Sequence, residues 1–390
     1  MGEEGYPTLW RLTVSRTSYD GPVRVAFDVG PVRGEPTGVG LYATAMANAL
    51  SRVLPADDLR LIGRRSDARG LPDSVGSQPR SSGPYPAWVE LRSAGDAKRA
   101  GADIVHYSDG IVPVVRHGRT VLAVHDLSAV RLWRTHRAPR WARIPLVLIS
   151  PRLADLVLVP SRATADEVVA LCRIKASRIE IVPYAPQSDV GPADGDTIAA
   201  VLSRYALERH RYILALGTIE PRKNHLRLIR AFERLIERGA LGSDVRLVIA
   251  GKPGWASGPV LRAVAESAVA QRILLPGYVP GADLPALMTG AGAVAYVSLY
   301  EGFGLPVVEA LACGAPTVTS NVSSMPEIAG DAGFLVDPFD VDDIGRGLAE
   351  ALEAGATDPE VVSVTSLARA STFSWATTAS AVVELYATRP

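Results

Sequence analysis

Short apolar runs alternate with amphipathic stretches along most of the chain. In the first half, runs typical of strands lie at 23–29, 103–106, 120–124, 156–159 and 179–182, and helical spacing lies at about 41–53, 140–153 and 161–172. Residues 64–86 are rich in Arg, Ser, Gly and Pro and predict a loop. Strands that alternate with helices favour a parallel sheet with helical crossovers.

The same alternation starts again after residues 186–198, a segment poor in large apolar side chains that we interpret as a linker. Strands are predicted at 212–217, 245–250, 273–275, 293–298 and 316–320, with helices at 224–238, 258–270, 282–289 and 305–313. The C-terminal residues are mostly helical. The pattern predicts an α/β protein with two doubly wound domains, and we expect ligands to bind beyond the carboxyl ends of the strands.

Composition narrows the class of protein. The chain has 390 residues, of which 47% are apolar and 21% charged, as in an ordinary globular protein, and this length predicts two domains. Basic and acidic residues number 41 each, so the formal net charge is zero, which argues against a nucleic-acid-binding protein. Only four of the 41 cations are lysines: Lys98, Lys175, Lys223 and Lys252.

Cysteines and termini indicate the compartment. Cys172 and Cys313 are too few for a disulfide framework or a metal cluster, and we expect both to be small core residues. No apolar run approaches the ~18 residues of a membrane span. Residues 1–22 predict an irregular lead-in that begins with acidic residues, unlike a signal peptide. We therefore expect a cytoplasmic protein.

Two predicted strand ends in the first half carry candidate chemistry. Gly38 and Gly40 follow the first strand and would let main chain approach a ligand, although the third glycine of a dinucleotide fingerprint is missing and a plain tight turn is the alternative. His125, next to Asp126, follows the strand at 120–124. It could orient or exchange a proton with a reacting group, or simply cap the next element.

Two strand ends in the second half carry stronger signals. After the strand at 212–217, Arg222 and Lys223 are predicted at a helix N-terminus, where the helix dipole repels cations. An anionic ligand would explain them, and a solvated charge pair is the alternative. The other signal is Glu301 to Glu309, where Gly302 and Gly304 would let free amides lie against phosphate.

The two glutamates suit hydroxyl-bearing ligands. A carboxylate accepts hydrogen bonds from sugar or ribose hydroxyls, whereas a glycosidase pair would leave the neighbouring phosphate donors without a role. A surface loop followed by a capped helix is the alternative for this segment. Asp340, Asp342 and Asp343 precede a helical run, where capping is favoured over metal binding. Phosphate charge would then be neutralised by Arg222, Lys223 and helix ends, without a metal.

Together these residues resemble the GT-B-fold retaining glycosyltransferases, specifically glycosyltransferase family 4. The resemblance is carried by the two glutamates Glu301 and Glu309 with seven residues between them, and by the segments 220–224, 251–254, 275–279, 314–318 and 326–327. It is dense from about 212 to 340 and thinner in the first half. One departure is Pro183-Tyr184-Ala185-Pro186, where the family often has Asn-Gly; we expect it to affect the hinge and not the donor site.

The resemblance implies roles for the donor site. Glu309 would hold the ribose of a nucleotide sugar, and Glu301 would contact the hydroxyls of the donor sugar. Arg222 and Lys223 would bind the diphosphate and stabilise it as a leaving group.

Main chain and the opposing domain would complete that site. The amides at Phe303, Gly304 and Leu305 would lie near the sugar and phosphates. From the opposing domain, His125 would lie near the sugar, and the loop with Gly38 and Gly40 would close over the phosphates.

The resemblance also implies an architecture. Two Rossmann-like domains would face each other across a cleft: an acceptor domain at 23–190 and a donor domain at 200–371. Residues 372–390 would form a helix that crosses back to the N-terminal domain.

The implied activity is a metal-independent, retaining transfer of a hexose to a glycan, glycolipid or small-molecule acceptor, as in cell-envelope glycan biosynthesis. The donor would be a nucleotide-diphosphate sugar, with GDP-mannose as our choice, and no further cofactor. Two alternatives stay open: a pseudo-glycosyltransferase or sugar-nucleotide isomerase of the same fold, and a catalytically silent nucleotide-sugar-binding protein. Leaving-group cations argue against the silent protein.

The acceptor side is marked by one basic stretch. Residues 131–143 hold five Arg, two Trp and no acid, and an apolar run follows at 144–149. This stretch could contact the inner face of an anionic membrane or bind a lipid-linked acceptor; a solvated loop and helix is the equal alternative.

Overall fold

The computed structural model describes residues 23–32, 38–63, 70–72, 85–132, 144–187 and 189–387. The described residues fall into two compact units: those within 23–123, 153–157 and 375–387, and those within 124–152 and 158–374. The predicted lead-in at 1–22 and most of the basic stretch, 133–143, lie outside the described residues. The domain boundaries expected from the sequence stay predictions.

Six strands form the first sheet, in the order β2-β1-β3-β4-β5-β6. They are β1 (Val25–Asp28), β2 (Leu59–Ile62), β3 (Ile104–Tyr107), β4 (Arg119–Ala123), β5 (Leu156–Val159) and β6 (Ile179–Ile181). The helices of this part of the chain are α1 (Val39–Val53), α2 (Tyr85–Leu91), α3 (Ser93–Arg99), α4 (Ser128–Arg131), α6 (Ile144–Leu153) and α7 (Arg162–Cys172). Strand β1 pairs with β2 and β3, and β3 with β4, all in parallel.

The second sheet has the order β12-β11-β10-β7-β8-β9. Its strands are β7 (Tyr212–Leu216), β8 (Arg246–Ala250), β9 (Ile273–Gly277), β10 (Ala293–Tyr296), β11 (Thr317–Ser320) and β12 (Gly333–Val336). The chain builds outward from β7 to β9 and then returns to the other side of β7 with β10. The strand order therefore reverses between β7 and β10, which is the place where open parallel sheets bind ligands at their carboxyl edge.

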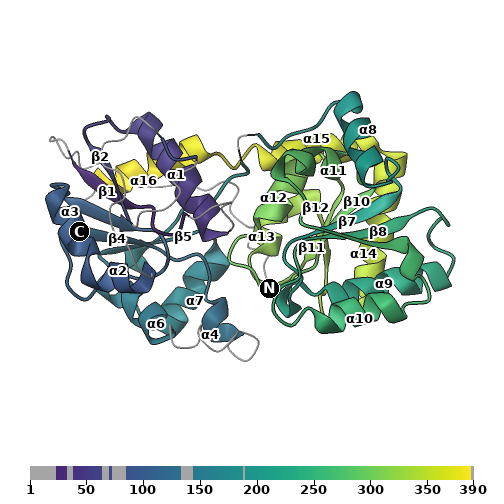
Figure 1. Ribbon diagram of the computed structural model, residues 1–390, viewed down its shortest axis with the longest axis horizontal. Coiled ribbons are helices and arrows are strands. Elements are labelled where there is room, and N and C mark those ends of the chain that lie inside the picture. The colour runs from purple at the N-terminus through teal and green to yellow at the C-terminus, as the bar shows by residue number, and fades with distance from the viewer. Residues whose placement is uncertain are drawn as a thin grey trace, which may run out of the picture. The chain divides into compact units, whose positions relative to one another are not determined.

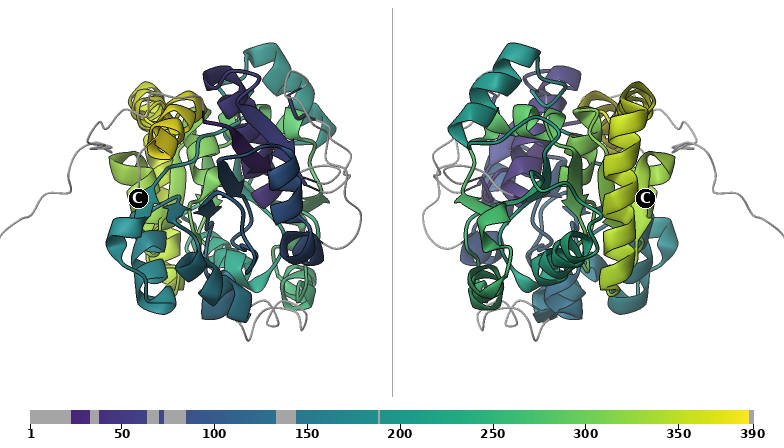
Figure 2. Two further views of the ribbon diagram at one scale, coloured as in Figure 1. Left: turned by 90° about the vertical axis from the view of Figure 1, so that its left-hand side faces the viewer. Right: turned by 90° about the vertical axis from the view of Figure 1, so that its right-hand side faces the viewer.

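Helices cover both faces of the second sheet (Figure 1). They are α8 (Gly195–Arg204), α9 (His225–Glu237), α10 (Gly258–Glu266), α11 (Leu284–Thr289), α12 (Leu305–Ala312), α13 (Met325–Ala329), α14 (Val341–Thr357) and α15 (Pro359–Ala370). Helix α14 is the yellow-green helix in the right-hand view of Figure 2.

Strand β7 shows how the alternating side chains build two cores. Ile213 and Ala215 pack with buried residues of α9 and α14, whereas Leu214 and Leu216 pack with those of α8 and α11. Successive side chains of a strand point to opposite faces, so an uninterrupted apolar run is what a strand buried on both faces requires.

The last helix, α16 (Trp375–Ala387), belongs to the first unit and lies beside α1 (Figure 1). The buried imidazole of His106 on β3 joins the two helices. Its Nε2 lies 3.2 Å from the Tyr42 hydroxyl of α1, and its Nδ1 lies 2.6 Å from the Tyr386 hydroxyl of α16. Arg119 of β4 adds a hydrogen bond of 3.1 Å from Nη1 to the carbonyl of Leu385.

The structure confirms the predicted α/β class with two parallel, doubly wound sheets, and places Cys172 and Cys313 in buried positions. Strands β2 and β12 and helices α2 and α3 were not predicted. The predicted linker is too long at its end, because α8 begins at Gly195. The Asp194 side chain caps this helix by accepting a hydrogen bond of 2.8 Å from the Thr197 amide.

Candidate functional site

The candidate site lies at the carboxyl ends of the two central strands of the second sheet. Glu220, Arg222 and Lys223 follow β7, and Glu301 follows β10. The two strands pair in parallel, with Leu214 opposite Val294, so the segments that follow them emerge side by side. Pairing of the strands therefore joins motifs that are 78 residues apart in the sequence.

Two cations bind the Glu301 carboxylate, one at each oxygen. The Lys223 ammonium donates a hydrogen bond of 2.7 Å to Oε1, and Arg222 Nη1 forms an ion pair with Oε2. Arg222 also donates from Nη2 to Glu220 Oε1 at 2.8 Å and from Nη1 to the Tyr300 carbonyl at 2.9 Å. Tyr296, the last residue of β10, donates to Glu301 Oε1 at 3.0 Å. We call Glu220, Arg222, Lys223, Tyr296 and Glu301 the ion-pair cluster.

Charges in the ion-pair cluster balance, with two cations and two carboxylates. Burial alone would raise the pKa of Glu301, but Lys223 and Arg222 outweigh it and lower the pKa to about 2. Burial also lowers the pKa of Lys223, against the opposing effect of Glu301. Glu301 is therefore ionised at neutral pH because its two cations compensate its burial.

The cations do not stand on the helix where the sequence predicted them. Pro221–Lys223 form a short 3-10 turn, and α9 begins only at His225. Asn224, with a left-handed φ of 63°, separates the 3-10 turn from α9. Its side-chain amide donates hydrogen bonds to the carbonyls of Val297 and Pro338, at 3.1 and 2.7 Å. Because asparagine tolerates this conformation, the chain can turn here. Lys223 and Arg222 therefore point to Glu301.

The two glycines after Glu301 serve close packing within the protein. A Cβ atom at Gly302 would collide with the carbonyl oxygen of His125, and one at Gly304, where φ is 107°, would collide with Met325. Gly302 is therefore required for close packing against the main chain at His125, and its approach to a ligand stays a prediction. Gly304 precedes the first residue of α12, Leu305.

Hydroxyl groups fix the main chain of the same segment. The Gly302 carbonyl accepts hydrogen bonds from Ser161 Oγ at 2.7 Å and from Thr164 Oγ1 at 3.1 Å, at the start of α7. Ser324 Oγ lies 3.0 Å from the Glu301 carbonyl and 2.8 Å from that of Phe303. With its carbonyls bonded to these hydroxyls, the segment is held in a defined conformation.

The imidazole of His125 pairs with the hydroxyl of Tyr184. Its Nδ1 lies 2.6 Å from the Tyr184 hydroxyl, while Asp126 Oδ1 accepts from the amide of Ser128 at 2.8 Å. The Tyr184 ring in turn contacts the Phe303 ring, with centroids 5.2 Å apart. Tyr184, which belongs to the segment expected to affect only the hinge, therefore touches two candidate site residues, His125 and Phe303.

Glu309 occupies a different environment from Glu301. It lies on α12, and burial together with the negative charge of Asp189 raises its pKa to about 7. Among the described residues, no cation pairs with its carboxylate. A carboxyl group of this kind is partly ionised near neutral pH, and its ionised form is the stronger acceptor of hydrogen bonds from hydroxyl groups.

The remaining candidates belong to the first unit or to main chain. Gly38 precedes α1 with a φ of 54°, and Gly40 is buried within that helix. Their predicted contact with phosphates stays a prediction. The first turn of α12 starts at Leu305, whose amide has no helical partner, whereas Pro306 has no N–H and the Val307 amide bonds to the Gly304 carbonyl at 2.9 Å.

Sequence reasoning missed several residues of the site. Tyr296 and Tyr184 look like core residues in the sequence, and Ser161, Thr164 and Ser324 lie far from the motifs they support. The one usable signal was the position of Tyr296 at the end of an otherwise aliphatic strand.

The acidic cluster at Asp340 is a helix cap. The Asp340 carboxylate caps α14 through the Asp342 amide at 2.8 Å, as the sequence predicted. Within the described ranges, no three His, Cys, Asp or Glu side chains are arranged to hold a metal ion. None of the helices in these ranges has the length and apolar character of a membrane span.

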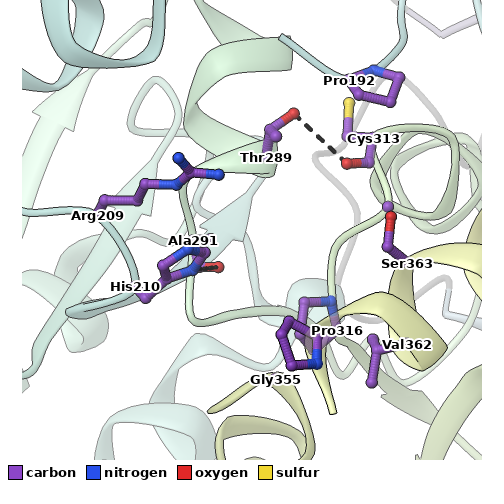
Figure 3. A pocket seen from close by; sticks show the side chains of 12 residues that line it. Pro192, Arg209, His210, Thr289, Ala291, Cys313, Pro316, Gly355, Val362 and Ser363 are labelled. Carbon is purple, nitrogen blue, oxygen red and sulfur yellow. Dashed lines mark hydrogen bonds between the residues drawn. The ribbon is translucent and has the colours of Figure 1, made fainter. Parts of the chain in front are cut away.

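One pocket lies at the opposite edge of the second sheet (Figure 3). His210, Ala291 and Pro316, which line it, come just before β7, β10 and β11. Thr289 Oγ1 donates a hydrogen bond of 3.4 Å to the Cys313 carbonyl at its rim. This amino edge is not where parallel sheets place their chemistry.

The sheets and the carboxyl-edge site define a class: two-domain α/β proteins of the GT-B type. Family models agree in both halves, one described as "Glycosyltransferase Family 4" at residues 36–185 and one as "Glycosyl transferases group 1" at residues 204–362. Among solved structures, one from Anabaena, HepE in complex with UDP-glucose, has a TM-score of 0.73 at 16% identity, over 93% of this chain and 99% of that chain.

Sequence relatives make the assignment narrower. The chain is 30% identical to the O-antigen chain mannosyltransferase B of Escherichia coli over 93% of this chain and 99% of that protein. It is 33% identical to the serotype-specific mannosyltransferase WbdA of Escherichia coli over 59% of this chain, but over only 28% of the length of that relative. The chain belongs to glycosyltransferase family 4 and is a mannosyltransferase-like hexosyltransferase.

Proposed function

We propose that this glycosyltransferase transfers mannose from GDP-mannose to a cell-surface glycan, with retention of configuration and without a metal ion. The observation that carries the proposal is the pair of partly buried cations that contact Glu301 at the carboxyl edge of the sheet, where the strand order reverses. Relatives described as mannosyltransferases, one of them acting on an O-antigen chain, support the choice of sugar and acceptor class.

Hydrogen-bonding capacity supports a diphosphate sugar as the ligand. The Lys223 ammonium has three N–H groups, of which two are bonded to Glu301 and Tyr296 among the described residues. The Glu301 carboxylate has about four acceptor sites, of which Lys223, Tyr296 and Arg222 occupy three. One donor of Lys223 and one acceptor site on Glu301 Oε2 therefore remain, which suits a ligand with a phosphate oxygen and a sugar hydroxyl.

In the proposed reaction, the bond between the anomeric carbon and the diphosphate oxygen breaks and negative charge develops on the diphosphate. Arg222, Lys223 and the first amides of α12 would stabilise that charge, so the site can act without a metal. Glu301 would hold the hydroxyls of the oxocarbenium-like sugar, and Glu309 those of the ribose. The acceptor hydroxyl would attack on the face from which the diphosphate leaves and give its proton to an oxygen of that diphosphate, which retains the anomeric configuration.

The test begins with a thermal-shift screen of GDP, UDP and ADP sugars on the whole chain. We expect GDP-mannose to raise the melting temperature most. Transfer from this donor to a mannose-containing oligosaccharide should proceed in EDTA, and NMR of the product should show the anomeric configuration of the donor. An inverted product or loss of turnover in EDTA would contradict the mechanism. Donor consumption that yields an isomer or a non-glycosidic product would contradict the transferase itself.

A further inference from the structure

Tyr296 stands at the centre of the ion-pair cluster without a role in the reaction described above. It ends β10, pairs across to Thr319 of β11, and is 4% exposed. Thr319 Oγ1 also donates a hydrogen bond of 2.9 Å to its carbonyl. The ring is therefore carried by a central strand whose main chain is fixed, which makes the position of its hydroxyl well defined.

The Tyr296 hydroxyl joins the two charged groups that the reaction needs. It accepts a hydrogen bond from the Lys223 ammonium and donates one of 3.0 Å to Glu301 Oε1. A phenylalanine would fill the same volume with no hydroxyl to satisfy, and a buried hydroxyl costs free energy unless it is bonded. The hydroxyl is thus matched to Lys223 and Glu301, and its single proton is already committed to the carboxylate.

We propose that Tyr296 is a positioning residue: its hydroxyl holds the Lys223 ammonium against Glu301, so that the remaining N–H of Lys223 is directed at the leaving diphosphate. The proposal rests on the proposed function, because it assumes that Lys223 and Glu301 act on a nucleotide sugar. In this role Tyr296 acts through Lys223 and Glu301.

The same hydroxyl favours the charged form of both neighbours. Burial raises the pKa of Tyr296 well above its usual value, so the phenol stays protonated and can donate to Glu301. Its oxygen stabilises the Lys223 ammonium, whose pKa burial lowers. Arg222 and Glu220 also act on the Lys223 ammonium. Asp126, after β4, acts on Arg222, and Lys223 lowers the pKa of His225 on α9.

Removing only the hydroxyl tests the proposal. In Tyr296→Phe, loss of a hydrogen bond between charged groups should lower kcat about tenfold to 100-fold, with KM for the donor within about threefold of wild type. Glu301 loses a donor, so its pKa should rise, and Lys223 loses an acceptor, so its pKa should fall. The pH profile of kcat/KM should therefore narrow from both the acidic and the alkaline side.

Tyr212→Phe is the matched control. Tyr212 is a fully buried tyrosine on the neighbouring strand β7, and its hydroxyl donates to the Leu287 carbonyl at 2.6 Å. This variant should lose thermal stability while keeping the pH profile of wild type. Overlapping pH profiles for Tyr296→Phe and wild type would overturn the proposal, and so would equal loss of kcat in the two phenylalanine variants.

A measurement on the wild-type chain keeps the proposal testable if Tyr296→Phe does not fold. With only four lysines in the sequence, ¹⁵N-lysine labelling gives at most four ammonium signals, and Lys223→Arg assigns one of them. We expect the Lys223 signal to be protected from solvent exchange without ligand and to shift when nucleoside diphosphate is added. A signal that exchanges as fast as that of exposed Lys175 would overturn the role of Tyr296. If wild type transfers no sugar while the signal is protected, the proposed function fails and the coupling of Tyr296 to Lys223 stands.

Discussion

Replacing Glu309 with glutamine should make the ligand-free protein more stable, and only at higher pH. Burial and Asp189 raise the pKa of Glu309 from 4.5 to about 7, so the folded state favours its neutral form. The unfolded chain gives up this proton near pH 4.5, and the folded chain keeps it until about pH 7. Wild-type stability from this group is therefore full below pH 4.5, falls as the pH rises to 7 and stays low above it.

The size of the effect follows from the pKa. A difference of two to three pH units corresponds to about 3 kcal/mol at 1.36 kcal/mol per unit, and this is an upper value because the side chain is partly exposed. One kcal/mol moves the melting temperature of a domain of this size by about 2–4 °C. Glu309→Gln, which keeps the shape and removes the titration, should therefore melt up to about 6–12 °C above wild type at pH 8.

Thermal unfolding of ligand-free protein between pH 5 and pH 8 measures this effect. The difference between Glu309→Gln and wild type should be small at pH 5 and grow up to pH 7. Glu360→Gln, at an exposed glutamate near the start of α15, is the control and should follow wild type throughout. A difference that does not change with pH would refute the reasoning about the Glu309 environment.

Three further predictions concern the ligand and the main chain of the site. If the Glu309 carboxylate binds ribose, affinity for a nucleotide sugar, whose diphosphate does not titrate here, should be about tenfold weaker at pH 6 than at pH 8, and titration of Glu309→Gln should be flat over that range. Gly302→Ala should lower turnover about 100-fold, because the added Cβ would collide with the His125 carbonyl and shift the adjoining Glu301; steady-state kinetics at wild-type level would contradict this. Tyr184→Phe should lower kcat/KM about fivefold and leave nucleoside diphosphate binding unchanged, as calorimetry can check.

The sequence predicted most of the strands and helices, because each has a local pattern of apolar residues. Aliphatic runs such as Tyr212–Leu216 predicted the strands because burial on both faces leaves no room for polar side chains. The sequence also predicted that Lys223 and Glu301 lie in one site, because both follow strands of a parallel sheet whose carboxyl ends share an edge.

Contacts between distant segments could not be predicted in the same way. The residues near Gly302 in the sequence do not indicate that the His125 carbonyl lies where a side chain at position 302 would be. They also do not indicate that the Ser161 hydroxyl bonds to the Gly302 carbonyl. The left-handed turn at Asn224 decides where Lys223 points, and asparagine is only one of the residues that could have ended a loop there. These features depend on tertiary packing and leave no local period.

Calorimetric titration of a nucleoside diphosphate tests the central claim most directly, because the ion-pair cluster is proposed to grip a diphosphate. The nucleotide is the one that stabilises wild type in the thermal-shift screen. In Lys223→Ala the Kd should be about tenfold to 100-fold weaker than in wild type, since a charge-assisted hydrogen bond is lost. Lys175→Ala, at an exposed lysine, should bind like wild type. Equal Kd values for Lys223→Ala and wild type, in a variant that remains folded, would contradict the account.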